Sequence, residues 1–111
     1  MHWLYLFIAI IMEVAGTTCM KLSDGFSKTV PSVSIFIFYG LSFTFLTLAL
    51  KALPIGITYA VWAAAGTALI TMVGIAWFGE SINLLQLFSL VLIIIGVAGL
   101  HLSRQPMEYT P

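Results

Sequence analysis

The chain has 111 residues, of which 61% are hydrophobic and only 7% are charged, and its mean hydropathy is +1.13. A water-soluble domain needs about 25% charged residues to cover its surface, so most of this surface must face something other than water. The formal net charge of zero argues against a nucleic-acid partner. We therefore expect an integral membrane protein in contact with the lipid bilayer.

Four segments are long and apolar enough to cross a bilayer, which takes about 20 apolar residues. We expect these helices at residues 3–20, 32–50, 55–78 and 84–102. Pro31 should open the second helix and Pro54 the third, because proline is tolerated in a first helical turn. The connections are short, so consecutive helices should be antiparallel neighbours. The sequence predicts an all-α transmembrane domain over residues 1–103 and a disordered tail over 104–111.

The first segment contains Glu13, a carboxylate within an apolar helix. A charge at bilayer depth costs at least about 2.5–3.5 kcal/mol, so such residues usually mark a transport pathway or a proton relay. Burial disfavours the ionised form, and a carboxyl so placed can hold a proton in one state and a cation in another. A glutamate that snorkels to the interface is disfavoured, because Glu13 lies in the middle of the span.

Small residues share the helical face of Glu13, among them Ala9, Gly16 and Thr17. They would let another helix approach closely, or they would leave room for a ligand. Helix packing explains the pattern as well as a cavity does, and both interpretations stay open.

The third segment places two aromatic side chains beside small residues on one face: Tyr59, Trp62, Ala63 and Gly66. Aromatic rings attract organic cations, by up to about 2 kcal/mol when desolvated, and Tyr59 can also donate a hydrogen bond to Glu13. An interfacial aromatic belt is the alternative, but Tyr59 and Trp62 lie several residues inside the span. Tyr39 belongs to a similar stripe on the second segment, where lipid or packing contact is an equally good explanation.

The fourth segment carries small residues in one stripe, at Ser89, Gly96 and Gly99. This spacing suits helix–helix contact in lipid, so we interpret the segment as an assembly surface; the alternative is a generic apolar span.

The loop charges are balanced between the two sides of the membrane. Lys21 and Lys28 belong to one side, and Lys51 and Arg104 belong to the other. The positive-inside rule then gives no preferred orientation, which predicts insertion both ways unless so few charges are uninformative. Four short helices barely enclose a pathway, so we expect a dimer that pairs two copies of Glu13.

Residues for metal or covalent chemistry are sparse. His2 and His101 lack ligand spacing around them, and Cys19 stands alone in an apolar run. With no nucleophile–base pair and no metal set, we expect neither an enzyme nor a bound cofactor.

Several runs of residues together form a specific pattern. They are EVAGTTCMK at 13–21, SDGF at 23–26, Pro31-Ser32, LPIGITYAVW at 53–62, FGE at 78–80 and the region of Gly96. In these runs the chain resembles, over residues 3–103, the small multidrug resistance family of bacterial proton-coupled exporters. The resemblance implies an antiparallel, dual-topology homodimer in the bacterial inner membrane, with protons as the coupling ion.

The resemblance also implies roles for individual residues. Glu13 would be the shared site for protons and organic cations, and the dimer would contact itself through Ser89, Gly96 and Gly99. The substrate-binding residues would be Tyr59, Trp62, Tyr39, Thr17 and Ala9, and the spacing on the third helix adds Ala63 beside them. The third helix would kink at residues 64–66, where the family usually has Gly-x-Gly and this chain has Ala64 and Gly66. The missing glycine makes the kink stiffer.

Branches of the family differ beside the glutamate. A guanidinium-exporting branch typically has tryptophan three residues after it, whereas this chain has Gly16. We favour export of quaternary ammonium and polyaromatic cations from a roomier site; guanidinium export is the alternative. The balanced loops argue against an obligate heterodimer. A regulatory membrane subunit, in which Glu13 pairs with a cation of another protein, is the alternative outside transport.

Overall fold

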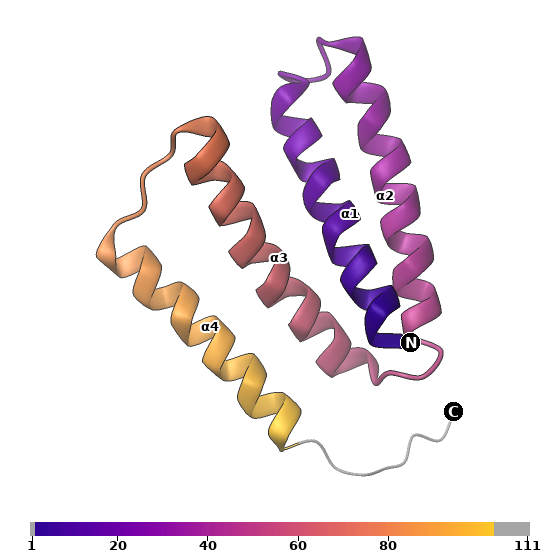
Figure 1. The fold of residues 1–111 in the computed structure, drawn as a ribbon, viewed down its shortest axis with the longest axis vertical. Coiled ribbons are helices and arrows are strands. Elements are labelled where there is room, and N and C mark those ends of the chain that lie inside the picture. Colours follow the sequence, from indigo (N-terminus) through magenta and orange to yellow (C-terminus); the bar gives the residue numbers. More distant parts are fainter. Residues whose placement is uncertain (1, 104–111) are drawn as a thin grey trace.

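The computed structural model describes residues 2–103, and this part of the chain forms four α-helices. Their bounds are α1 His2–Leu22, α2 Thr29–Ala49, α3 Ile55–Phe78 and α4 Leu84–Leu102 (Figure 1). Each helix is long and apolar enough to cross a membrane. The predicted tail, which includes Arg104, lies outside the described residues.

The helix ends differ from the predicted ones around the first loop. α1 continues to Leu22, and α2 begins at Thr29, so Pro31 lies within the first turn of α2 and does not open it. Proline fits there because the N–H groups of a first turn have no acceptor within the helix. Pro54 is the residue that precedes α3, with φ −64° and ψ 140°.

The loop between α1 and α2 is a tight left-handed turn. Asp24, Gly25 and Phe26 all have positive φ, at 50°, 70° and 68°. The buried Ser23 hydroxyl closes the turn, since it donates to the Met20 carbonyl at 2.8 Å and accepts from the Phe26 N–H at 3.1 Å. This turn returns α2 antiparallel along α1.

Close packing of α1 and α2 uses the small residues of α1. Ala9 is fully buried, and the buried Ser42 hydroxyl of α2 donates to the Ala9 carbonyl at 2.8 Å. A bulkier side chain in place of alanine would keep the two backbones apart. Of the two interpretations left open for this residue, the structure supports helix packing.

The helices lie in the order α2, α1, α3, α4, so α1 stands between α2 and α3 (Figure 1). The expectation that α2 and α3 would be neighbours was therefore wrong, although the rings of Phe43 and Trp62 meet between them with centroids 6.2 Å apart. The chain from Ala49 to Ile55 reaches about 20 Å when extended, which covers two interhelical distances of about 8–10 Å. A short connection between α2 and α3 is therefore long enough to pass the end of α1, which lies between them.

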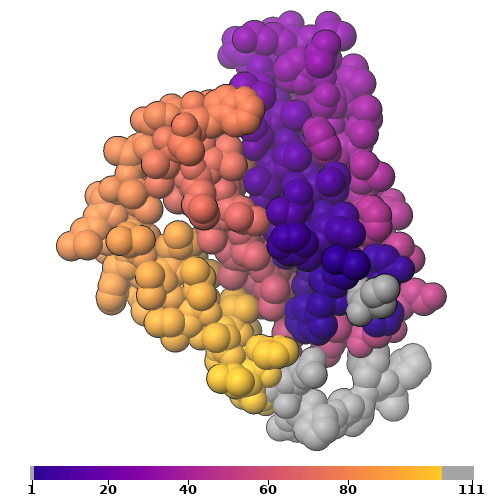
Figure 2. Space-filling model, viewed as in Figure 1, coloured from indigo at the N-terminus to yellow at the C-terminus, as the bar shows by residue number. Residues whose placement is uncertain are grey.

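The molecule is a flattened layer with principal dimensions of 47 × 35 × 19 Å. Its small core lies mainly along α1, at Leu6, Ile10 and Val14. α4 packs on α3 at the edge of the layer, away from α2 (Figure 2), and none of its residues is buried. Lipid or a second protein chain must therefore cover most of the apolar surface of α4.

Candidate functional site

Glu13 lies halfway along α1 and faces α3 across a pocket of about 300 Å³. Spacings of three and four residues on α3, about one helical turn each, bring aromatic, small and hydroxyl side chains to the same pocket. The lining residues are Glu13, Thr17, Tyr59, Trp62, Ala63, Gly66, Thr67 and Ile70. The structure therefore brings together five of the residues that the sequence proposed for substrate binding, across two helices.

Hydroxyl groups orient the Glu13 carboxylate. Its Oε2 accepts a hydrogen bond from Thr17 at 3.0 Å, and Tyr39 lies 3.5 Å from the same oxygen. The Thr17 and Tyr39 hydroxyl oxygens are only 2.6 Å apart. Because Thr17 gives its single proton to Glu13, Tyr39 must donate to Thr17. The result is a short relay from α2 through Thr17 to the carboxylate.

The other carboxylate oxygen faces α3. A Cβ added to the buried Gly66 would lie 3.4 Å from Glu13 Oε1. The absence of a side chain at Gly66 thus lets the carboxylate approach α3 without a clash. The two carboxylate oxygens of Glu13 therefore have different surroundings: Oε2 lies beside hydroxyl groups, and Oε1 lies against the pocket wall formed by α3.

The aromatic wall of the pocket is built from edge-to-face contacts. The rings of Tyr59 and Trp62 have centroids 5.9 Å apart at 88°, and Trp62 meets Phe43 of α2 at 6.2 Å and 87°. The sequence allowed Tyr59 to donate to Glu13, but the hydroxyls near this carboxylate are those of Thr17, which donates to it, and of Tyr39, which lies 3.5 Å away. The reason is that Tyr59 lies at the rim, where its side chain is 65% exposed.

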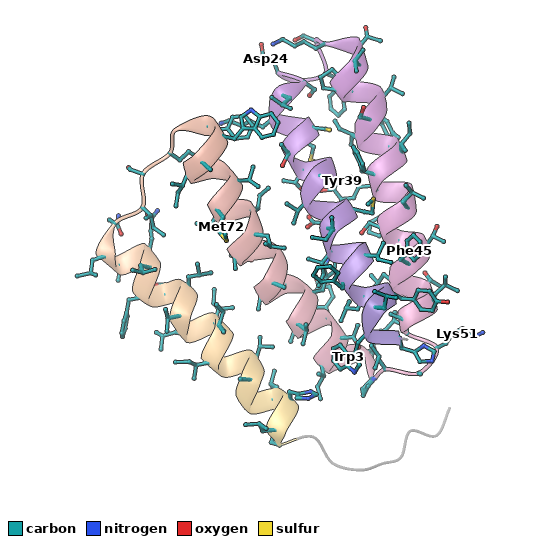
Figure 3. All side chains as sticks on the ribbon, in the orientation of Figure 1. Trp3, Asp24, Tyr39, Phe45, Lys51 and Met72 are labelled. Atoms are coloured by element: carbon teal, nitrogen blue, oxygen red, sulfur yellow. The ribbon has the colours of Figure 1, made fainter. Side chains whose placement is uncertain are left out.

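Tyr39 occupies the space beside Gly16. A Cβ on Gly16 would lie 2.8 Å from two ring atoms of Tyr39, which reaches from α2 toward α1 (Figure 3). The expectation that Gly16 makes the site roomier is therefore wrong in this structure. The glycine instead admits the tyrosine ring that positions Thr17.

Other predicted residues fall outside the pocket or have roles that remain predictions. Ala9 was expected to line the chamber, but it is buried against α2, because Ser42 draws the two helices together at that level. Ala64 is buried within α3, which is a continuous helix from Ile55 to Phe78. The hinge at Ala64 and Gly66 stays a prediction.

The three residues predicted for dimer contact lie on the exposed helix. Added Cβ atoms on Gly96 and Gly99 would meet nothing within 4 Å, and Ser89 faces the space between α3 and α4. Their role in assembly stays a prediction.

Sequence reasoning overlooked Thr67 and Ile70, which also line the pocket. They lie four and seven residues after Ala63, so they extend the same face of α3 by one and two turns. The helical spacing alone identifies them, because both continue the face of α3 that carries Ala63.

Replacing Gly16 with alanine is expected to destabilise the helix pair. The new methyl group would displace the Tyr39 ring and cost about 1–3 kcal/mol of overpacking, against a gain of up to about 1 kcal/mol in helix propensity. We expect a lower thermal unfolding temperature in detergent. Gly40→Ala is the matched control, because its Cβ would meet nothing within 4 Å. Equal stability of the two variants would contradict the packing of Tyr39 on Gly16.

A family model and several known proteins match this chain over most of its length. The model of the family described as Small Multidrug Resistance protein matches residues 1–93. The chain is 48% identical over 102 residues to the uncharacterized membrane protein YvaE of Bacillus subtilis, covering 92% of this chain and 86% of the relative. It is 47% identical over 102 residues to the quaternary ammonium compound-resistance protein QacC of Staphylococcus aureus, covering 92% of this chain and 95% of QacC.

A third relative has a similar name and a similar coverage. The quaternary ammonium compound-resistance protein QacG of Staphylococcus sp. (strain ST94) is 45% identical over 101 residues, covering 91% of this chain and 94% of QacG. The matches extend over all four helices and include the pocket described above. This chain is a multi-pass membrane protein that belongs to the small multidrug resistance family.

Proposed function

We propose that this protein is a proton-coupled antiporter that exports lipophilic, aromatic and quaternary ammonium cations across a bacterial cell membrane. The observation that carries the proposal is the position of Glu13: a carboxylate in a membrane-spanning helix lines the same pocket as Tyr59 and Trp62. A carboxylate supplies charge for a cation, and the faces of aromatic rings attract it further once water is excluded.

Competition for Glu13 couples the two fluxes. Deprotonated Glu13 binds a cation from the cytoplasm, and protons that arrive from outside displace it after the site has changed sides. The relay through Thr17 and Tyr39 supports this role, because the hydroxyls stabilise the carboxylate through Oε2 while Oε1 lies against the pocket wall. A cation and a proton cannot both neutralise the Glu13 carboxylate at once. Export of a cation is therefore coupled to entry of protons, and neither is transported alone.

A second, inverted copy of the chain would complete the site. The flattened layer leaves Tyr59 65% exposed and α4 without a buried residue. The first and third loops lie at one end of the layer, opposite the second loop (Figure 1), so the lysines of the described loops are shared between both ends. These features support an antiparallel homodimer in which two Glu13 carboxylates share one chamber and the fourth helices contact each other.

The substrate class follows from the aromatic wall and the relatives. Two of the relatives are named for resistance to quaternary ammonium compounds. The rings of Tyr59 and Trp62 suit a cation with apolar groups around its charge. We therefore favour such cations over guanidinium. The small size of Gly16 does not support this choice, because the Tyr39 ring fills the space beside it.

Proton release on cation binding tests the proposal. Adding tetraphenylphosphonium to the detergent-solubilised protein is expected to release protons, because cation binding requires the deprotonated carboxylate. Protonation removes the charge that holds the cation, so apparent affinity should fall as the pH falls. Asp24→Asn, which removes an exposed carboxylate outside the pocket, should release protons like the wild type. No release from the wild type at any pH would refute the shared site.

A further inference from the structure

A second, larger pocket adjoins the Glu13 pocket. It has a volume of about 570 Å³ and lies between α3, α4, the end of α1 and the loop 79–83. Thr17, Thr67 and Ile70 line both pockets, so the two pockets adjoin at these residues, and we call the pair the corridor. The corridor runs from Glu13 toward the end of the molecule that carries the third loop.

Threonine hydroxyls line the corridor with hydrogen-bond acceptors. Thr18 donates to the Val14 carbonyl at 2.9 Å, Thr67 to the Ala63 carbonyl at 2.6 Å, and Thr71 to the Thr67 carbonyl at 2.7 Å. A hydroxyl has only one proton to give. With that proton given to the helix backbone, each hydroxyl oxygen can only accept, and its lone pairs favour a cation and its water over an anion.

A carboxylate stands at the outer end of this corridor. Gly79 ends α3 in the left-handed conformation with φ 68°, and the Glu80 N–H then donates to the Gly74 carbonyl at 3.0 Å. This reversal lays the Glu80 side chain over Gly74, where an added Cβ would lie 3.0 Å from Glu80 Cδ. The absence of a side chain at Gly74 therefore makes room for the exposed Glu80 carboxylate at the outer end of the corridor, which we call its mouth.

The mouth already contains a cation on an aromatic ring. The Lys21 ammonium lies 5.8 Å from the centroid of Phe78, and both residues line the corridor together with Glu80. This distance is within the range of cation–π attraction. The side chain of Lys21 thus places a cation on an aromatic ring within the pocket that Glu80 also lines.

We propose that Glu80 and Phe78 form an outer binding site for organic cations, which is distinct from the Glu13 site and connected to it by the threonine-lined corridor. A mobile cation displaces the Lys21 ammonium from Phe78, is held by Glu80, and passes along the corridor to Glu13. The inference rests on the proposed export function and adds a site that concentrates cargo before it meets the coupling carboxylate.

Transport kinetics in proteoliposomes test the outer site, with tetraphenylphosphonium as the probe. Glu80→Gln removes the charge, and Gly74→Ala keeps the charge but displaces it from its seat. An exposed carboxylate contributes modestly, so we expect KM to rise about three- to fivefold with kcat unchanged, and the difference to shrink as salt is raised. Asp24→Asn, which neutralises a carboxylate in the first loop at the same end, should keep the KM of the wild type.

The outcomes separate the outer site from the export function itself. A wild-type protein that moves no cation would overturn the export function. Normal transport with equal KM for Glu80→Gln and Asp24→Asn would overturn the outer site alone, as would a fall in kcat without a change in KM.

Binding to a transport-dead variant gives a second measurement. Equilibrium dialysis of Glu13→Gln with tetraphenylphosphonium should show weak, salt-sensitive binding that disappears in the Glu13→Gln, Glu80→Gln double variant. Identical binding by the single and double variants would also overturn the outer site.

Discussion

Replacing Glu13 with glutamine is expected to abolish cation export. Loss of one partner from a desolvated charge pair costs about 2–5 kcal/mol, which corresponds to a loss in cation affinity of at least about thirtyfold. The amide also cannot titrate, so any residual binding should lose its dependence on pH. Both effects act on the same step, because Glu13 is the carboxylate of the aromatic pocket.

Ethidium efflux from a sensitive bacterium, with expression checked in the membrane, measures this effect. Failed insertion would not explain a loss, because a neutral side chain enters the bilayer more easily than a charged one. Glu13→Asp is the matched control: it keeps a titratable group and should retain weaker efflux that still depends on pH. Undiminished resistance in Glu13→Gln cells would be incompatible with the proposed mechanism.

Adding a single lysine to one loop is expected to eliminate activity through topology alone. Ser27 lies in the first loop and Ala52 in the second, at opposite ends of the layer, and both are exposed. Ser27→Lys or Ala52→Lys should each bias all copies toward one orientation under the positive-inside rule. Neither variant alone would then find an inverted partner, so ethidium efflux should collapse.

Coexpression provides the control for this experiment. The two variants are biased in opposite directions, so cells that contain both should recover efflux, and a chain carrying both substitutions should behave like the wild type. Full activity of either single variant expressed alone would contradict the antiparallel dimer. Normal activity of the double variant also excludes local damage by either lysine.

The sequence was a good guide to the number and nature of the helices. Length and hydropathy suffice for this, because crossing the bilayer sets a minimum apolar length, and the four spans are found in the structure. The order of helices was harder to predict. Local patterns cannot tell that the loop 50–54 passes beyond the end of α1, since that depends on which small residues of α1 meet α2.

Within the site, helical spacing placed Tyr59, Trp62 and Gly66 on one face of α3, and this face lines the same pocket as Glu13. Periodicity fails where the partner belongs to another helix. The contact between Gly16 and the Tyr39 ring joins residues far apart in the chain, and a glycine alone gives no sign of what fills its space. The same limit hid the hydroxyl relay, although both of its members had been singled out separately.

The bare surface of α4 has a consequence for how resistance depends on gene dosage. A helix with no buried residue contributes little to the stability of a lone chain, so in the proposed dimer the completed site forms by mass action between copies in the membrane. At low copy number most chains stay monomeric, and their pockets lack the residues that the second copy would supply. Doubling the number of copies then raises the number of completed sites more than twofold, so expression level, as much as affinity for the cation, sets the protection that a cell obtains.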